Sequence, residues 1–236
     1  MKLIGIIGAI DVEIQLIKNN MTLLDEKQYA GFKFYVGKYK NLDVVLVSCS
    51  VGKVNASSCT QILIDRFNVT EIINTGIAGS LNEDVKLCDI VISDNVTCHD
   101  VRQVQMRNCF PYKECFKGDR ELINLAVRAC ENMKGKKFNY HVGRIVTGED
   151  FVSDDKLKQH IIDNYNPFCV EMEGGAIGHV AHINGVPFII IRCISDNADN
   201  SSMIYYDEFE EIFADISANL TLNILDLLIL ARDRKL

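Results

Sequence analysis

Short apolar runs without polar alternation recur along this chain, and they constrain its fold more than any other feature. They lie at residues 3–10, 43–49, 71–79, 89–96, 143–148 and 188–196. A strand that lacks the alternation of apolar and polar side chains is buried on both faces. Such strands are typical of α/β proteins, in which helices cover both sides of the sheet.

Helical patterns occupy several of the stretches between and after these runs. They span residues 53–67, 119–133, 173–185 and 206–235. Gly185 and Pro187 form a stop signal at the end of the third pattern. We therefore predict a single domain over residues 1–236, with a three-layer α/β/α architecture and a central mixed, mostly parallel, twisted sheet. The segment 97–118 shows no clear period, so we predict an irregular excursion there.

The charge balance argues against a nucleic-acid partner. The 236-residue chain has a formal net charge of −7, and its Lys and Arg residues form no cluster. No apolar run approaches the roughly 20 residues that span a bilayer. The first run is followed by Asp11 and Glu13 where a signal peptide would carry a cleavage site. We expect a soluble cytoplasmic protein with no membrane partner.

The cysteine and histidine patterns predict neither disulfides nor a metal site. Nine cysteines are present, and no CxxC pair occurs, so we expect reduced thiols that pack as small apolar groups. His179 and His182 lie three residues apart on a predicted helix, but the pattern offers no third ligand. GxGxxG and Walker patterns are absent, which disfavours dinucleotides and nucleoside triphosphates. We therefore expect no cofactor and no metal.

Acidic residues stand where predicted strands end. Glu13 follows the first run, Glu173 follows "VEM", and Asp196 ends the last run. Because ligands of open α/β sheets bind beyond the carboxyl ends of the strands, we predict that these three acids meet around one ligand. A buried carboxylate needs a partner, a proton or a ligand. On "SDNAD" alone, a helix N-cap or turn aspartate that accepts hydrogen bonds from nearby backbone amides is the favoured interpretation.

Several motifs together resemble the 5′-methylthioadenosine/S-adenosylhomocysteine nucleosidases of the purine nucleoside phosphorylase/hydrolase superfamily, over nearly the whole chain. The motifs are "IGIIGAIDVEI" at the start, "VGKVNA" (51–56), "INTGIAGSL" (73–81), "DIVISD" (89–94), "VEMEGGAIGHVAH" (170–182) and "RCISDNAD" (192–199). The combination of VEME with R-x-IS-D is specific. The resemblance implies a nucleoside phosphorylase-like fold, a homodimer and hydrolysis of the N-glycosidic bond of methylthioadenosine and S-adenosylhomocysteine. The resemblance also implies a role in methionine salvage and a third candidate substrate, 5′-deoxyadenosine.

The resemblance also implies a division of labour among the acids. Adenine leaves poorly as an anion, so the reaction needs an acid at the base and an activated water at the sugar. Asp196 would protonate N7 of adenine, which requires a raised pKa. Glu13 would orient and deprotonate the water. Glu173 would bind the ribose hydroxyls.

The same resemblance implies further substrate-binding residues. Met172 would pack against the sugar and the alkylthio tail, Phe151 would stack on adenine, and Val152 would offer backbone groups to the base. Plain core positions are the alternative for Met172 and Phe151. The remaining predicted substrate-binding residues are Ile77, Ser195, Arg192 and Val51. Arg192 would lie near the water and keep Glu13 ionised; a structural ion pair is its alternative.

Other functions stay open at this stage. Phosphorolysis is disfavoured because "GAIDVEI" places a carboxylate where phosphate would be repelled. A futalosine-type hydrolase would need a cation for the substrate's carboxylate, and Arg102 or Arg107 could supply one. A noncatalytic nucleoside-binding or surface-interaction protein on the same fold is the third alternative. Phe110, Tyr112 and Phe116 are candidates for closing the tail pocket of a neighbouring subunit, and Ile77 suggests an apolar tail pocket.

Overall fold

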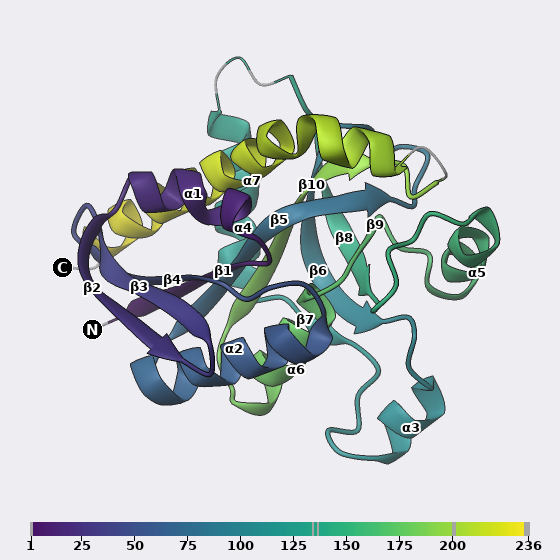
Figure 1. The fold of residues 1–236 in the computed structure, drawn as a ribbon, viewed down its shortest axis with the longest axis horizontal. Coiled ribbons are helices and arrows are strands. Elements are labelled where there is room, and N and C mark those ends of the chain that lie inside the picture. The colour runs from purple at the N-terminus through teal and green to yellow at the C-terminus, as the bar shows by residue number, and fades with distance from the viewer. Residues whose placement is uncertain (1, 134, 136, 200–201, 234–236) are drawn as a thin grey trace.

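The fold is described from a computed structural model, which covers residues 2–133, 135, 137–199 and 202–233 (Figure 1). The strands are β1 (Leu3–Gly8), β2 (Thr22–Tyr29), β3 (Phe32–Tyr39), β4 (Leu42–Ser48), β5 (Glu71–Ser80), β6 (Ile90–Cys98), β7 (Phe116–Lys117), β8 (Tyr140–Thr147), β9 (Cys169–Glu171) and β10 (Phe188–Asp196). The helices are α1 (Asp11–Asn19), α2 (Lys53–Phe67), α3 (Gln103–Asn108), α4 (Arg120–Asn132), α5 (Asp155–Tyr165), α6 (Gly174–Ile183) and α7 (Ser202–Asp233).

Within these residues, the strands form one mixed sheet in the order β10-β6-β8-β9-β5-β1-β4-β3-β2. β7 pairs with β6, and β10 also pairs with β5. Parallel pairing runs through β4, β1, β5 and β10, and again through β6, β8 and β9. The strands β5 and β10 are buried at every position. Their continuous burial explains why both read as apolar runs without alternation.

Helices cover both faces of the sheet, which confirms the predicted three-layer α/β/α architecture (Figure 1). One face carries α1, α4 and α7, and α7 packs against β5 and β10. The other face carries α2 and α6, which pack against each other. Each face has its own apolar core, so the sheet is desolvated on both sides. The helices α3 and α5 follow β6 and β8 and lie beyond the carboxyl ends of these strands (Figure 1).

The sequence patterns missed the elements that are mostly exposed. The strand β2 is exposed over nearly its whole length, and it forms a hairpin with β3 at the edge of the sheet. The side chains of β2 are exposed on both faces of the strand, so they form no apolar run. The helices α1 and α5 were also not predicted. The segment 97–118, predicted as irregular, contains α3 and the short β7.

The C-terminal helix corrects one expectation about membranes. Its segment Glu210–Ala231 is long and apolar enough to cross a bilayer by length and composition, with a mean hydropathy of 1.5, although we expected no such run. Most of this segment is buried inside the protein, where α7 packs against β5, β10, α1 and α4. Its apolar side chains therefore serve the core.

Candidate active site

One cavity of about 380 Å³ lies at the carboxyl ends of the strands. Its walls come from Ala9, Ile10, Glu13, Val51, Ile77, Ala78, Gly79, Asp150, Phe151, Val152, Val170, Glu171, Met172, Glu173, Ser195 and Asp196. Every predicted site residue except Arg192 is among them. The acids Glu13, Glu173 and Asp196, which lie far apart in the sequence, therefore face one space, as expected for the carboxyl edge of an α/β sheet.

Glu13 reaches the cavity because α1 begins immediately after β1. Its carboxylate accepts hydrogen bonds from the backbone N–H groups of Ala9 (2.5 Å), Ile10 (3.2 Å) and Ile77 (3.1 Å). The side chain is buried, and this burial raises the pKa of Glu13. The nearby Arg192 charge and the three backbone donors lower the pKa and offset part of that rise. Glu13 is thus a desolvated carboxyl group in a fixed orientation.

Asp196 enters from the end of β10 and is 3% exposed. One carboxylate oxygen accepts a hydrogen bond from the N–H of Ala198 (2.7 Å), and the other accepts one from the Ser195 hydroxyl (2.8 Å). The bond to Ala198 is the local turn contact that the sequence alone allowed. The same side chain nevertheless lines the cavity, so the turn fixes its orientation without removing it from the site.

Two glycines of β5 make room for these carboxylates. A Cβ at Gly76 would lie 2.3 Å from Oε1 of Glu13, and a Cβ at Gly79 would lie 2.8 Å from Oδ1 of Asp196. Neither distance is possible for real non-bonded atoms. The small residues of "NTGIAGS" therefore permit close approach of two acids to the strand, in addition to any role beneath a ligand.

Glu173 precedes α6, but its side chain does not cap that helix. It is 5% exposed, so the alternative of an exposed acid at a helix start does not apply. Its Oε1 accepts a hydrogen bond from the N–H of Gly52, at 2.9 Å, just before α2. Burial, followed by the nearby Glu171 charge, raises the pKa of Glu173, while Arg192 and the Gly52 N–H oppose the rise.

Arg192 was predicted as a substrate-binding residue, but it is not among the residues that line the cavity. It is 1% exposed, and its Nη2 donates to Glu171 (2.5 Å) and to Asn74 (2.7 Å). Arg192 therefore forms a buried ion pair with Glu171, which is the structural alternative that the sequence left open for it. Its charge still lies close enough to Glu13 to lower the pKa of that acid. The sequence did not indicate that Glu171, a residue of the same "VEME" motif, would be the partner of Arg192.

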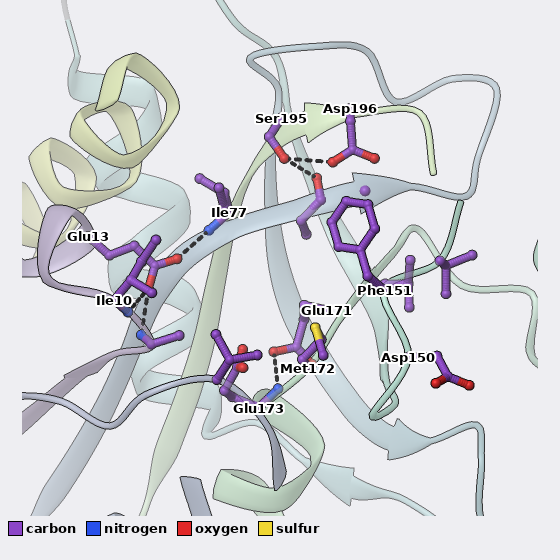
Figure 2. A pocket seen from close by; sticks show the side chains of 16 residues that line it. Ile10, Glu13, Ile77, Asp150, Phe151, Glu171, Met172, Glu173, Ser195 and Asp196 are labelled. Carbon is purple, nitrogen blue, oxygen red and sulfur yellow. Dashed lines mark hydrogen bonds between the residues drawn. The ribbon is translucent and has the colours of Figure 1, made fainter. Parts of the chain in front are cut away.

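The remaining predicted residues divide the cavity into regions (Figure 2). Ser195, Asp196 and the Phe151 ring lie toward one end, whereas Glu13, Ile10 and Ile77 lie at the opposite side. Glu171, Met172 and Glu173 lie together along a third wall. Phe151 is 40% exposed and Val51 is 42% exposed, so both stand near the opening. Val152 is buried in the wall.

Sequence reasoning missed several other lining residues. Ala9 and Ile10 follow β1, and Asp150 lies in the loop that carries Phe151. Each of these residues stands just after a predicted strand, and this position could have identified them as candidates. The histidines are elsewhere: the His179 ring stacks on Phe116 with centroids 4.5 Å apart, and His182 lies against the same ring. Among the described residues, no three His, Cys, Asp or Glu side chains are grouped as a metal site.

Residues 3–229 match a family model described as the phosphorylase superfamily. The chain is also 40% identical to the 5′-methylthioadenosine/S-adenosylhomocysteine nucleosidase of Halalkalibacterium halodurans over 228 residues, an alignment that covers 94% of this chain and 96% of that relative. It belongs to this nucleosidase family. This membership confirms the resemblance of the sequence motifs and the nucleoside phosphorylase-like fold.

Solved structures agree with the family assignment. The Neisseria meningitidis nucleosidase, in complex with methylthio-immucillin-A, superposes with a TM-score of 0.90 at 32% identity, covering 95% of this chain and 99% of that one. The futalosine hydrolase of Helicobacter pylori has the same fold, with a TM-score of 0.87 at 28% identity, and the match covers 95% and 97% of the two chains. Similarity of fold alone therefore does not separate the nucleosidases from futalosine hydrolases.

Proposed function

We propose that this protein hydrolyses the N-glycosidic bond of 5′-methylthioadenosine and S-adenosylhomocysteine, releasing adenine and the thioribose, with 5′-deoxyadenosine as a further substrate. The observation that carries the proposal is the convergence of Glu13, Glu173 and Asp196 on one cavity in a chain of this family. Its domain is the whole chain, residues 1–236. We place the enzyme in the cytoplasm, where it would serve methionine salvage and the recycling of S-adenosylmethionine by-products.

The roles of the acids follow from where charge develops in the reaction. Bond cleavage passes through an oxocarbenium-like ribosyl cation and a departing purine. Asp196 donates a proton to N7 so that adenine leaves neutral, with the Phe151 ring beside it as the stacking surface (Figure 2). Glu13, on the opposite side of the cavity, orients a water and takes its proton. Glu173 binds the ribose hydroxyls, and its negative charge stabilises the nearby cation.

The charge of the cavity supports a neutral or cationic ligand over an anion. Five of the described lining residues are acidic, namely Glu13, Asp150, Glu171, Glu173 and Asp196, and none of the described lining residues is Lys, Arg or His. Phosphate and the carboxylate of futalosine would both find no cation to pair with among these lining residues. Arg102 and Arg107, the cations considered for futalosine, do not line the cavity, and Arg107 pairs with Glu114 at 3.0 Å.

The decisive experiment measures adenine release from methylthioadenosine, S-adenosylhomocysteine and futalosine by the purified protein, with and without phosphate. We expect rapid release from the first two and rates that do not depend on phosphate. A requirement for phosphate would indicate a phosphorylase, and preference for futalosine would indicate the other hydrolase. Tight binding of methylthioadenosine by the folded protein without adenine release would favour a noncatalytic nucleoside-binding protein.

We also propose a homodimer in which the segment 97–118 meets the neighbouring subunit. Phe110 and Tyr112 are 70% and 67% exposed, so they are the aromatic side chains that the segment offers to a partner. Phe116 is buried against His179, which removes it from the predicted candidates. The salt bridge between Lys53 and Asp100 joins the start of this segment to α2, close to Val51 at the cavity. Light scattering on the purified protein measures the subunit number.

A further inference from the structure

Glu171 lines the cavity, yet its carboxylate is surrounded by donors from the protein. It accepts hydrogen bonds from Arg192 Nη2 (2.5 Å), Gly174 N (2.6 Å), Glu173 N (3.0 Å) and the Thr147 hydroxyl. An ionised carboxylate offers about four acceptor sites. Three of these donors share Oε2 and the Thr147 hydroxyl binds Oε1, so most of the acceptor capacity of Glu171 is used within the protein. Its position next to Glu173 points to an indirect role.

One guanidinium nitrogen lies between two carboxylates. Nη2 of Arg192 is 2.5 Å from Oε2 of Glu171 but 3.8 Å from Oε2 of Glu173. The first distance is a charge-assisted hydrogen bond, and the second is too long for one. Glu173 therefore keeps Oε2 outside the reach of the arginine, while its Oε1 is held by the Gly52 N–H.

We propose that Glu171 is a positioning residue, which holds Arg192 away from Glu173 and thereby keeps the Glu173 carboxylate available for the ribose. This inference rests on the role given to Glu173 in the proposed function. The hydrogen bonds from Glu173 N and Gly174 N to Glu171 also fix the backbone from which Glu173 projects. A buried guanidinium that loses its nearest carboxylate moves to the next one, because an unpaired buried charge is costly. Here the next one is Glu173.

The test compares Glu171→Gln with wild type. The amide oxygen of Gln can still accept from Gly174 and Glu173, but the charge that binds Arg192 is lost. We expect KM for methylthioadenosine to rise about tenfold to hundredfold, the fold-change of one hydrogen bond to a charged group, with a smaller change in kcat. An unchanged KM would overturn the proposal. Glu71→Gln, at a buried carboxylate outside the cavity that pairs with Lys2, is the matched control, and its KM should stay that of wild type.

A double-mutant cycle separates positioning from a structural role. If Glu171 acts through Glu173, the Glu171→Gln/Glu173→Gln variant has the same KM as Glu173→Gln alone. Additive losses would show that Glu171 acts independently of Glu173. Should Glu171→Gln fold poorly, Glu171→Gln/Arg192→Gln replaces the ion pair with a neutral pair of similar shape. This double variant has no guanidinium that could bind Glu173, so its KM for methylthioadenosine should return toward the wild-type value. A KM as high as that of Glu171→Gln would contradict the proposal.

A crystal structure of Glu171→Gln tests the inference without any substrate. We expect Nη2 of Arg192 within hydrogen-bond distance of a Glu173 oxygen. An arginine that keeps its wild-type distance from Glu173 would overturn the inference even if the protein is an active nucleosidase. Conversely, absence of adenine release by the wild-type protein would defeat the proposed function while leaving this structural result intact.

Discussion

The carboxylate of Glu13 accepts a hydrogen bond from the backbone N–H of Ile77, 3.1 Å away and 64 positions later in the chain. This bond joins the first turn of α1 to the middle of β5, where the strand borders the cavity. Together with the N–H groups of Ala9 and Ile10, it holds the carboxylate at one place. The general-base role that we propose for Glu13 requires such a fixed orientation, because the base has to reach a water at a defined distance from the sugar.

We expect Glu13→Gln to lower kcat about 10²- to 10⁴-fold, because the amide oxygen can still accept from Ala9 and Ile10 but takes no proton from a water. The melting temperature should change little, because removal of a buried charge is offset by the lost acceptor for the Ile77 N–H. Adenine release and thermal unfolding are the measurements. The control is Asp11→Asn, at an exposed acid of the same helical turn, which should retain activity. Loss of activity in both variants would point to damage to α1.

Asp196→Asn keeps an acceptor for the Ala198 N–H but cannot donate a carboxylic proton to adenine. We expect a loss of about 10²- to 10⁴-fold in kcat and continued binding of methylthioadenosine. Ser195→Ala removes one neutral donor to Asp196, so its loss should stay below about tenfold. Single-turnover adenine release and ligand titration measure the two effects. A rate for Asp196→Asn close to that of Ser195→Ala would remove Asp196 from the acid role.

Gly76→Ala should reduce turnover strongly, because the added methyl group would lie 2.3 Å from Oε1 of Glu13 and displace it. Gly5→Ala, at a buried glycine of β1, would meet only side-chain atoms of Val69 and Leu63, at 3.3 to 3.4 Å. We therefore expect Gly5→Ala to retain the greater part of the wild-type kcat. Comparable losses of kcat in the two variants would mean that the effect comes from the strand and not from Glu13.

The pH dependence of activity follows from the raised pKa of Glu13, whose cause is burial. The base must be ionised to accept a proton, so activity is lost as pH falls through that pKa. We expect the acid limb of kcat/KM to lie above 4.5, the ordinary glutamate value. A profile of kcat/KM against pH measures it. An acid limb at or below 4.5 would contradict the desolvation of Glu13.

Stability should change with pH in the opposite sense. The pKa of Glu173 is higher in the folded protein than in the unfolded chain, so its contribution to stability is complete below about 4.5. That contribution is lost as pH rises through the folded-state pKa. We expect the free energy of unfolding of the ligand-free protein to fall over this interval, and to fall less in Glu173→Gln. Denaturant unfolding at several pH values tests the sign, and identical slopes for both proteins would refute it.

The sequence predicted which residues line the cavity better than it predicted the secondary-structure elements around it. Buried strands reveal themselves by continuous apolar runs, so the acids at their ends could be placed at one edge of the sheet. The hairpin of β2 and β3 left no such signal, because an exposed edge strand needs few apolar side chains. The helix α5 buries little, with Ile161 as its fully buried residue, so its apolar pattern was weak.

The sequence by itself determined the layered α/β architecture, the family, and the set of acids at the strand ends. It left open which carboxylate would bind the buried Arg192. Only the tertiary structure shows that Arg192 binds Glu171 and not Glu173. It also left open that Gly76 and Gly79 make room for Glu13 and Asp196. The physical reason is the same for both: apolar burial follows from local pattern, whereas hydrogen bonds and steric fit depend on atoms from distant segments that meet only when the chain folds.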